Sequence, residues 1–255
     1  MKFKFIIVVV SCSNMSEDNI CFNSLGRYNF FKKCNKLYYD MFKDEIKFFY
    51  VEYKNDITED LIEDGDFIYI KGTEEPLIPN FLNKTKLCIE YIDKNYDYDY
   101  VLRTNLSSLW NMSVLNSLYD NIPRNNFFGG HVMFDSFISG TGIIISRDLV
   151  NKFLEINKNQ YYYWFNEDVA ISMHMKERNV PLYNIGSLNN YKMNFQTLEE
   201  SLDENSTQNN ILEINDDTYT DDILYFRVKN ARVERDIYVF KKILKKLYNI
   251  DPEKI

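Results

Sequence analysis

The clearest candidates for acid–base chemistry are two neighbouring acids, Glu167 and Asp168, in the string Asn166-Glu167-Asp168-Val169. The string is typical of the start of a helix, with a polar residue at the cap position and acids in the first turn. The helix dipole favours negative charge at that end, so a carboxylate there would be ionised at neutral pH, as a general base must be. Acids also stand in first turns simply to complement the dipole, and the residues alone leave both interpretations open.

Other acids are spaced in ways that a cation could use. The strings Asp64-Gly65-Asp66 and Asp97-Tyr98-Asp99 both precede predicted strands. Ligands of open α/β sheets bind at the carboxyl ends of strands, so we do not expect either pair to hold a metal ion.

Residues 194–222 contain nine acids and no Lys or Arg, which predicts a long solvated loop. A metal-dependent transferase or nuclease would need this loop to order around a cation through Asp216, Asp217, Asp221 and Asp222.

Several common catalytic motifs are absent from the chain. There is no GxxxxGK[ST] string, no GxGxxG after a strand and no GxSxG, which disfavours P-loop, dinucleotide-binding and nucleophilic hydrolase classes. His131 and His174 are the only histidines, and the four cysteines have no CxxC spacing, so we expect no zinc site. The formal charge of −8, from 30 basic and 38 acidic residues, disfavours general nucleic-acid binding.

The elements that must position these residues follow from the apolar periodicity of the 255-residue chain. Predicted helices and strands alternate, which favours an α/β domain with a mostly parallel sheet. The strands are expected over residues 3–11, 46–51, 67–70, 100–103, 127–133 and 142–145, and the helices over residues 28–42, 79–92 and 113–119 and from residues 146 and 166. A further strand and helix are expected to carry the basic residues that begin at Arg227.

The first ten residues are basic and then apolar, but the apolar run is too short for a membrane-spanning helix. Its β-branched residues predict a buried first strand rather than a signal peptide. Together with cysteines that lack the density of a disulfide framework, this favours a cytoplasmic protein without membrane insertion.

Three strings occur along the chain in a recognisable order. The first is Tyr98-Asp99-Tyr100-Val101-Leu102-Arg103-Thr104-Asn105-Leu106-Ser107; the second is Ser139-Gly140-Thr141-Gly142-Ile143-Ile144-Ile145-Ser146-Arg147-Asp148-Leu149-Val150; the third is Glu167-Asp168-Val169. They follow a first strand that ends in Ser11-Cys12 and a segment Asn83-Lys84-Thr85-Lys86.

This order resembles the β-1,3-galactosyl- and N-acetylglucosaminyltransferase and Fringe-like families of the A-type (GT-A) glycosyltransferase fold. Those families show a Y-D-Y-V-x-K-T-D-D-D strand end, an S-G-x-G-Y-x-x-S-R-D-L-V segment and an E-D-V helix start. The resemblance spans about residues 3–190 and is most specific in the second and third strings. It implies a single GT-A-like, Rossmann-like α/β domain with a mixed, mostly parallel central sheet flanked by helices.

The resemblance also implies roles for the matching residues. Asp168, with Glu167 beside it, matches the catalytic base, which takes a proton from the acceptor hydroxyl as that oxygen attacks the anomeric carbon of the donor sugar. Trp164 stands just before it and is expected to stack on the acceptor, although core packing would also explain an aromatic there. The segment from Ser139 to Gly142 would let the backbone approach the donor sugar, or would form an ordinary tight turn. The residues expected to contact the nucleotide sugar are Ser11, Arg103, Asn105, Ser107, Ser139, Gly140, Thr141, Gly142, Arg227 and Lys229.

One departure from the family pattern matters for the chemistry. Where the families have three aspartates, the last of which typically holds Mn²⁺ against the donor diphosphate, this chain has Asn105-Leu106-Ser107. A hard cation needs oxygen ligands and leucine offers none, so we expect no bound metal and no other cofactor. Basic side chains would then neutralise the diphosphate: Arg227 and Lys229, with Arg232 or Arg235 behind them and Arg103 as a second candidate. The alternative for these C-terminal cations is a solvated surface.

The expected function is therefore an inverting glycosyltransferase that moves a sugar from a nucleotide sugar, by family implication UDP-linked, to a glycan or protein hydroxyl without a metal ion. Its expected partners are that donor and a glycan or glycoprotein acceptor. The chain would divide into a nucleotide-binding half (1–110), a sugar and acceptor half (111–193), an acidic flexible loop (194–222) and a basic C-terminal strand and helix (223–255). The alternative is a catalytically inactive transferase-like domain that binds a glycan or a protein, which loss of the aspartates would also explain.

Overall fold

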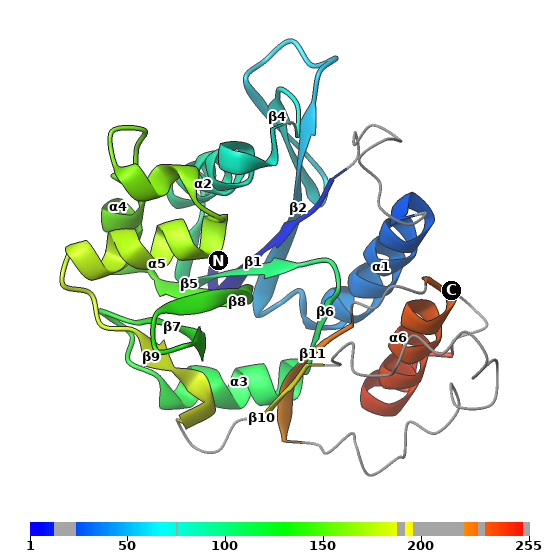
Figure 1. The fold of residues 1–255 in the computed structure, drawn as a ribbon. Coiled ribbons are helices and arrows are strands. Elements are labelled where there is room, and N and C mark those ends of the chain that lie inside the picture. The colour runs from blue at the N-terminus through cyan, green and yellow to red at the C-terminus, as the bar shows by residue number, and fades with distance from the viewer. Residues whose placement is uncertain (13–23, 75, 188–191, 196–221, 229–232, 252–255) are drawn as a thin grey trace, which may run out of the picture.

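The computed structural model describes residues 1–12, 24–74, 76–187, 192–195, 222–228 and 233–251 (Figure 1). Helices and strands alternate along most of this part of the chain. The helices are α1 (Ser24–Tyr39), α2 (Leu77–Asn95), α3 (Met112–Asn121), α4 (Arg147–Leu154), α5 (Glu167–Glu177) and α6 (Val233–Tyr248), and the short 3-10 helices are η2 (Asp40–Phe42), η3 (Tyr161–Trp164) and η4 (Ile185–Ser187). The strands are β1 (Lys2–Val10), β2 (Ile46–Lys54), β3 (Leu61–Asp64), β4 (Phe67–Lys71), β5 (Asp97–Asn105), β6 (Ser108–Trp110), β7 (Phe128–Met133), β8 (Phe137–Ser146), β9 (Tyr183–Asn184), β10 (Lys192–Phe195) and β11 (Ile223–Arg227).

Eight of these strands form one central sheet in the order β3-β4-β2-β1-β5-β8-β7-β9. The pairs β4–β2, β2–β1, β1–β5 and β7–β9 are parallel, and the pairs β3–β4, β5–β8 and β8–β7 are antiparallel. The α/β architecture predicted from the sequence, with a mixed and mostly parallel central sheet flanked by helices, is confirmed.

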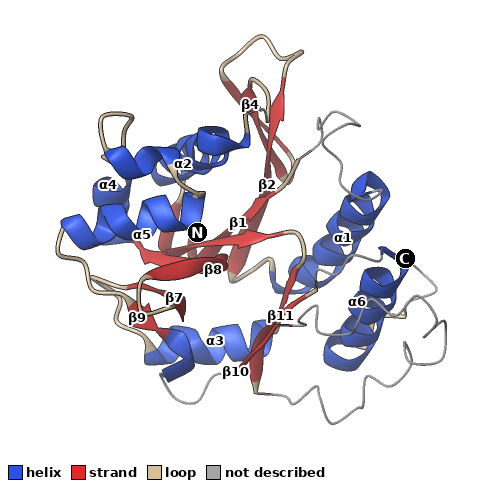
Figure 2. Ribbon diagram, in the orientation of Figure 1, coloured by secondary structure: helices blue, strands red, loops and turns tan. Residues whose placement is uncertain are grey.

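Helices cover both faces of the sheet, as Figure 2 shows. Side chains alternate along β1, so Phe5, Ile7 and Val9 pack on one face with α1, α3 and α6, while Ile6 and Val8 pack on the other face with α2, α4 and α5. Because both faces of β1 are buried, its sequence is an unbroken run of apolar residues. The interpretation of the N-terminus as a buried strand is therefore confirmed.

A second, three-stranded sheet in the order β10-β11-β6 was not expected from the sequence. In it β11 pairs antiparallel with β6, with Arg227 opposite Ser108. Since β6 follows closely on β5 in the chain, this small sheet brings the C-terminal strand beside the carboxyl end of β5. The short antiparallel edge strand β3 was not expected either; Gly65, at φ +61°, lies in the turn that joins it to β4.

The predicted starts of α4 and α5 are correct, with Ser146 and Asn166 at the cap positions, but neither side chain caps its helix by a hydrogen bond. The hydroxyl of Ser146 instead donates to Asp148 and accepts from the backbone N–H of Phe127.

Residues 196–221, most of the predicted acidic loop, lie outside the described residues, as do Asp216, Asp217 and Asp221. In the described residues no helix combines the length and the apolar character that crossing a bilayer requires.

Candidate functional site

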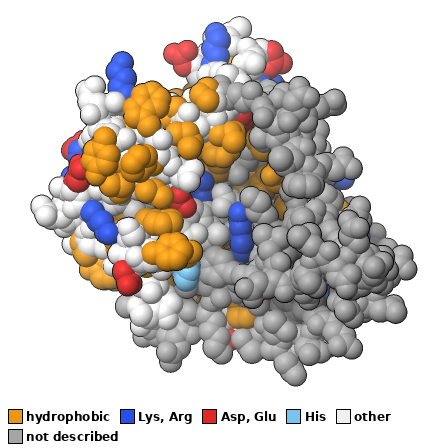
Figure 3. Space-filling model, viewed as in Figure 1, with side chains coloured by type: hydrophobic (Ala, Val, Ile, Leu, Met, Phe, Trp, Pro, Cys, Tyr) orange, Lys and Arg blue, Asp and Glu red, His pale blue; other side chains and the backbone are white. Residues whose placement is uncertain are grey.

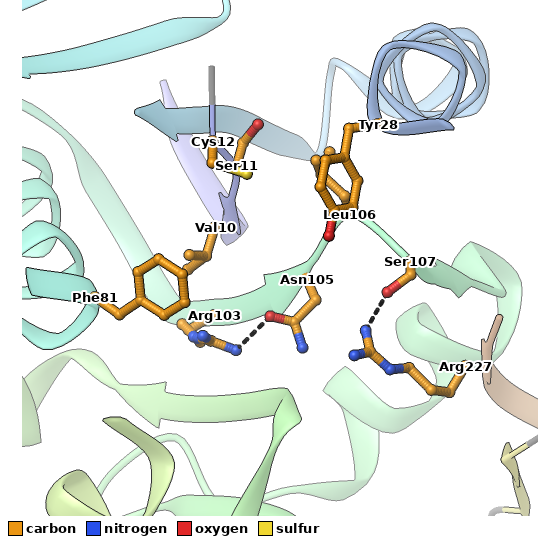
Figure 4. Close-up of a pocket in the computed structure, with 10 residues that line it drawn as sticks. All are labelled: Val10, Ser11, Cys12, Tyr28, Phe81, Arg103, Asn105, Leu106, Ser107 and Arg227. Carbon is orange, nitrogen blue, oxygen red and sulfur yellow. Dashed lines mark hydrogen bonds between the residues drawn. The ribbon is translucent and has the colours of Figure 1, made fainter. Parts of the chain in front are cut away.

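A pocket lies at the carboxyl ends of β1 and β5, the edge at which open α/β sheets bind ligands. Figure 4 shows its walls, which come from both strands, from α1 and α2, and from the end of β11. Its volume is about 150 Å³, and no carboxylate is present among the described residues that line it. The lining residues are Val10, Ser11, Cys12, Tyr28, Phe81, Arg103, Asn105, Leu106, Ser107 and Arg227.

Two buried ion pairs hold the end of β1 at this pocket. The Ser11 hydroxyl donates to Glu52, which also pairs with Lys32. The Ser11 carbonyl accepts a hydrogen bond of 2.6 Å from Nζ of Lys84, and the same ammonium binds both carboxylate oxygens of Glu74 at 2.7 and 2.9 Å. Lys84 and Glu74 are both fully buried. Ser11 is thus fixed through its hydroxyl and through its carbonyl.

Arg103, at the end of β5, forms a buried ion pair with Glu167 at the start of α5. Its Nε donates to Oε1 of Glu167 at 3.0 Å and its Nη2 binds Oε2, while Thr85 donates its hydroxyl to Oε1. Its Nη1 donates to Asn105 Oδ1 at 3.0 Å and to the Gly140 carbonyl. Both oxygens of Glu167 are therefore occupied, and the charge of Arg103 is already compensated.

Asp168 is half-buried beside this ion pair. Its Oδ2 accepts the backbone N–H of Gly140 at 3.0 Å, and its Oδ1 accepts the backbone N–H of Val169 at 3.0 Å. A Cβ atom built on Gly140 would lie 3.0 Å from Nη1 of Arg103 and 3.3 Å from Oδ2 of Asp168. Glycine therefore lets the carboxylate and the guanidinium approach the same point of β8. Of the two predicted catalytic acids, only Glu167 forms an ion pair among the described residues. Neither acid lines the pocket, and the role of Asp168 as a base stays a prediction.

Arg227 reaches the pocket from β11 and donates from Nη1 to the Ser107 hydroxyl. It forms no ion pair with any carboxylate of the described residues. Burial, and secondly the positive charge of Arg103, lowers the pKa of Arg227 to about 10. Arg227 therefore stays protonated at neutral pH, but as a cation that a bound anion would stabilise.

The segment Ser139–Gly142 forms part of β8, so the tight turn expected as an alternative is wrong. Gly142 is required by packing, because a Cβ atom there would lie 2.5 Å from the ring of Trp110. The Thr141 hydroxyl lies 2.7 Å from the Tyr225 hydroxyl. These residues do not line the pocket, and their predicted contact with the donor sugar stays a prediction.

The two Asp-x-Asp strings lie at the amino edge of the sheet, opposite the pocket. Asp97 pairs in register with Lys2 at the start of β1, and Asp66 directly precedes β4. Asp97 binds Arg147 at 2.6 Å, and Asp99 binds Lys2 at 2.6 Å. The prediction that both strings lie at the amino edge of the sheet is confirmed; that they hold no metal ion stays a prediction.

At Asn105–Ser107, where the families that the sequence resembles have metal-binding aspartates, the donor set does not fit a divalent cation. Asn105 Oδ1 accepts from Arg103, and Ser107 Oγ accepts from Arg227, so both oxygens face guanidinium groups that would repel a metal ion. Across the described ranges, no group of three or more His, Cys, Asp and Glu side chains could hold a metal ion.

Several residues of the site were not assigned from the sequence, among them Val10, Cys12 and Leu106. Tyr28 and Phe81 form walls of the pocket, but nothing distinguished them among 20 tyrosines and 19 phenylalanines. Lys84 stood in one of the strings that carry the family resemblance, and its complete burial beside Ser11 was not foreseen. Lys229 and Arg232 lie outside the described residues, and so does the side chain of Arg235.

Comparison with known proteins gives matches of structure alone. No family model matches the chain, and no curated protein does. Among solved structures, the galactosyltransferase LgtC in complex with donor and acceptor sugar analogs aligns with 77% of this chain and 76% of its own, at 13% identity and a TM-score of 0.42. An active-site mutant of LgtC aligns with 81% of each chain, at 12% identity and a TM-score of 0.41. The function proposed below is therefore argued from the residues of the site.

Proposed function

We propose that the protein is an inverting glycosyltransferase that takes a sugar from a nucleotide sugar, expected to be UDP-linked, and passes it to an acceptor hydroxyl without a metal ion. The observation that carries the proposal is Arg227, a cation that forms no ion pair with a described carboxylate. It binds Ser107, at the position where the families that the sequence resembles hold a metal ion. A guanidinium there can bind the diphosphate in place of the metal.

The reaction needs one base and one stabilised leaving group. The acceptor oxygen attacks the anomeric carbon, Asp168 takes the acceptor's proton, and the bond from that carbon to the diphosphate oxygen breaks. The nucleoside diphosphate leaves with an added negative charge, which Arg227 stabilises. Attack from the face opposite the leaving group inverts the anomeric carbon, and this requires only the single base that the start of α5 supplies.

Thermal unfolding with a panel of UDP-, GDP- and CMP-linked sugars tests the donor, with each sugar measured in EDTA and with Mn²⁺. Ligand at about 100 times Kd adds about 2.7 kcal/mol of stability, a shift of several degrees for a chain of this size. A shift that survives EDTA is the expected result and identifies the donor. A shift that needs Mn²⁺ would contradict metal independence, and no shift with any nucleotide sugar would favour the inactive binding domain.

Arg227→Met is expected to weaken nucleotide binding about 10- to 150-fold, because a hydrogen bond to a charged group contributes about 1.5–3 kcal/mol. Methionine keeps the apolar part of the arginine side chain. The substitution removes a cation that has no ionic partner among the described residues, so the melting temperature without ligand should not fall. Calorimetric titration with UDP and the identified UDP-sugar measures the affinity. The control is Arg147→Met, which removes an arginine from the amino edge of the sheet and should leave affinity unchanged. Equal affinity in the Arg227→Met variant and the parent protein would contradict the proposed diphosphate contact.

A further inference from the structure

The start of α5 is preceded by five consecutive aromatic residues, Tyr161–Phe165, most of which form η3. Two of them fix this segment to the domain. Tyr162 is fully buried and its hydroxyl donates to Glu177 at 2.7 Å. The hydroxyl of Tyr163 donates to Asn83 on α2. The segment is therefore held in place by its inner residues.

The other three aromatic side chains point to solvent. Tyr161 is 63% exposed, Trp164 is 56% exposed and Phe165 is 42% exposed. The rings of Tyr161 and Phe165 meet edge to face, with centroids 6.0 Å apart. Folding gains little from apolar area that stays in water, so packing of this domain does not explain these three residues. Hydrophobic side chains gather on the surface around α2 and α5 in Figure 3, and an exposed patch of this kind marks a binding surface.

The position and the charge of these side chains indicate what they bind. Four Cα steps separate Trp164 from Asp168, so the two Cα atoms are at most about 14 Å apart. Neither Trp164 nor the two neighbouring exposed rings carries a charge, in contrast to the pocket with its two arginines. A surface of neutral aromatic rings suits the apolar C–H face of a neutral pyranose, whose hydroxyl groups stay in water.

We infer that Tyr161, Trp164 and Phe165 form an acceptor platform, and that the acceptor is a neutral saccharide whose ring stacks on Trp164 beside Asp168. This deepens the proposed function and rests on it for the reaction. The binding itself can be tested without turnover.

Intrinsic tryptophan fluorescence can measure binding to the platform, because the protein has only two tryptophans, Trp110 and Trp164. Trp110 is 1% exposed, so solvent-accessible ligands act on Trp164. Titration with lactose, cellotriose and chitotriose should give a saturable change in tryptophan emission with at least one of them. The change should vanish in Trp164→Phe, which keeps an aromatic ring but removes the reporter. No change with any of these sugars would overturn the inference, and so would a change that persists in Trp164→Phe.

Kinetics with the donor found by thermal unfolding give the second test. Trp164→Ala should raise the acceptor KM about tenfold and leave kcat and the donor KM unchanged, since none of the three platform residues lines the diphosphate pocket. Trp164→Phe should restore most of the acceptor affinity. The control is Phe134→Ala, which removes a ring that is 84% exposed between β7 and β8 and should change no parameter.

The two tests separate failure of the platform from failure of the proposed reaction. Saturable binding of a saccharide without any transfer would support the platform and contradict the transferase. Transfer with an acceptor KM that is equal in Trp164→Ala and the parent protein would overturn the platform and leave the transferase intact.

Discussion

Asp168→Asn should lower the turnover of sugar transfer about 10²- to 10⁴-fold, the range that general acid–base catalysis contributes. The amide oxygen of asparagine can still accept the backbone N–H of Gly140, so the side chain should keep its position. The amide cannot take a proton from the acceptor hydroxyl, and its NH2 group cannot accept the second backbone N–H, that of Val169. Release of nucleoside diphosphate at saturating donor and acceptor measures the effect, and calorimetric titration should show unchanged nucleotide affinity.

Asp148→Asn is the matched control, because Asp148 also stands in the first turn of a helix and accepts a backbone N–H, from Asn126 at 2.9 Å. It belongs to α4, away from the pocket, and its replacement should leave turnover per folded molecule unchanged. Turnover of the Asp168→Asn variant within a few-fold of the parent protein would mean that the base is another group. The anomeric configuration of the product, read by NMR, tests the single displacement: retention would contradict it.

Lys84→Met should destabilise the protein by about 3–5 kcal/mol, because it leaves Glu74 fully buried without its counter-ion. For a chain of this size the melting temperature should fall by roughly 6–20 °C. The double variant Lys84→Met/Glu74→Leu should recover most of the loss, since neither charge of this buried pair is then left. Chemical unfolding measures all three proteins, and a double variant no more stable than the single one would contradict this explanation.

Lys94→Met is the control for that experiment. Lys94 binds Glu90 at the same 2.7 Å distance as the Lys84–Glu74 pair, but both partners are exposed on α2. Exposed pairs of this spacing contribute only about 0.3–0.5 kcal/mol, so the comparison isolates the effect of burial.

The stability loss in Lys84→Met should depend on pH. Burial raises the pKa of Glu74, and the Lys84 ammonium opposes that rise. Without Lys84 the folded-state pKa rises further above the unfolded value of about 4.3, so the folded protein binds the proton more strongly than the unfolded chain does. Stability of the variant then falls as pH rises through that window. Its deficit relative to the parent protein should be larger at about pH 8 than at about pH 5; an equal deficit at the two values would contradict a buried, uncompensated carboxylate.

Most strands of the central sheet could be predicted from the sequence, although the edge strand β3 could not. The unbroken apolar run of residues predicts that β1 is buried on both faces. In the structure, Phe5 and Ile7 face one helix layer and Ile6 faces the other. The alternation of helices and strands gave the parallel core, and the position of the Asp-x-Asp strings before their strands located them at the edge away from the pocket. These features depend on residues that are near neighbours along the chain.

The pairing of the charged groups could not be predicted from the sequence. Glu167 and Arg103 are 64 residues apart, and their ion pair leaves Asp168 as the acid that we propose for proton transfer. Arg227 and Ser107 are 120 residues apart and meet because β11 pairs with β6, two short strands of which only β11 had a predicted counterpart. Periodicity reports whether a residue is buried, but the partner of a buried charge is set by which strands lie side by side. That pairing is a property of the whole fold, and it brings Arg227 into the pocket.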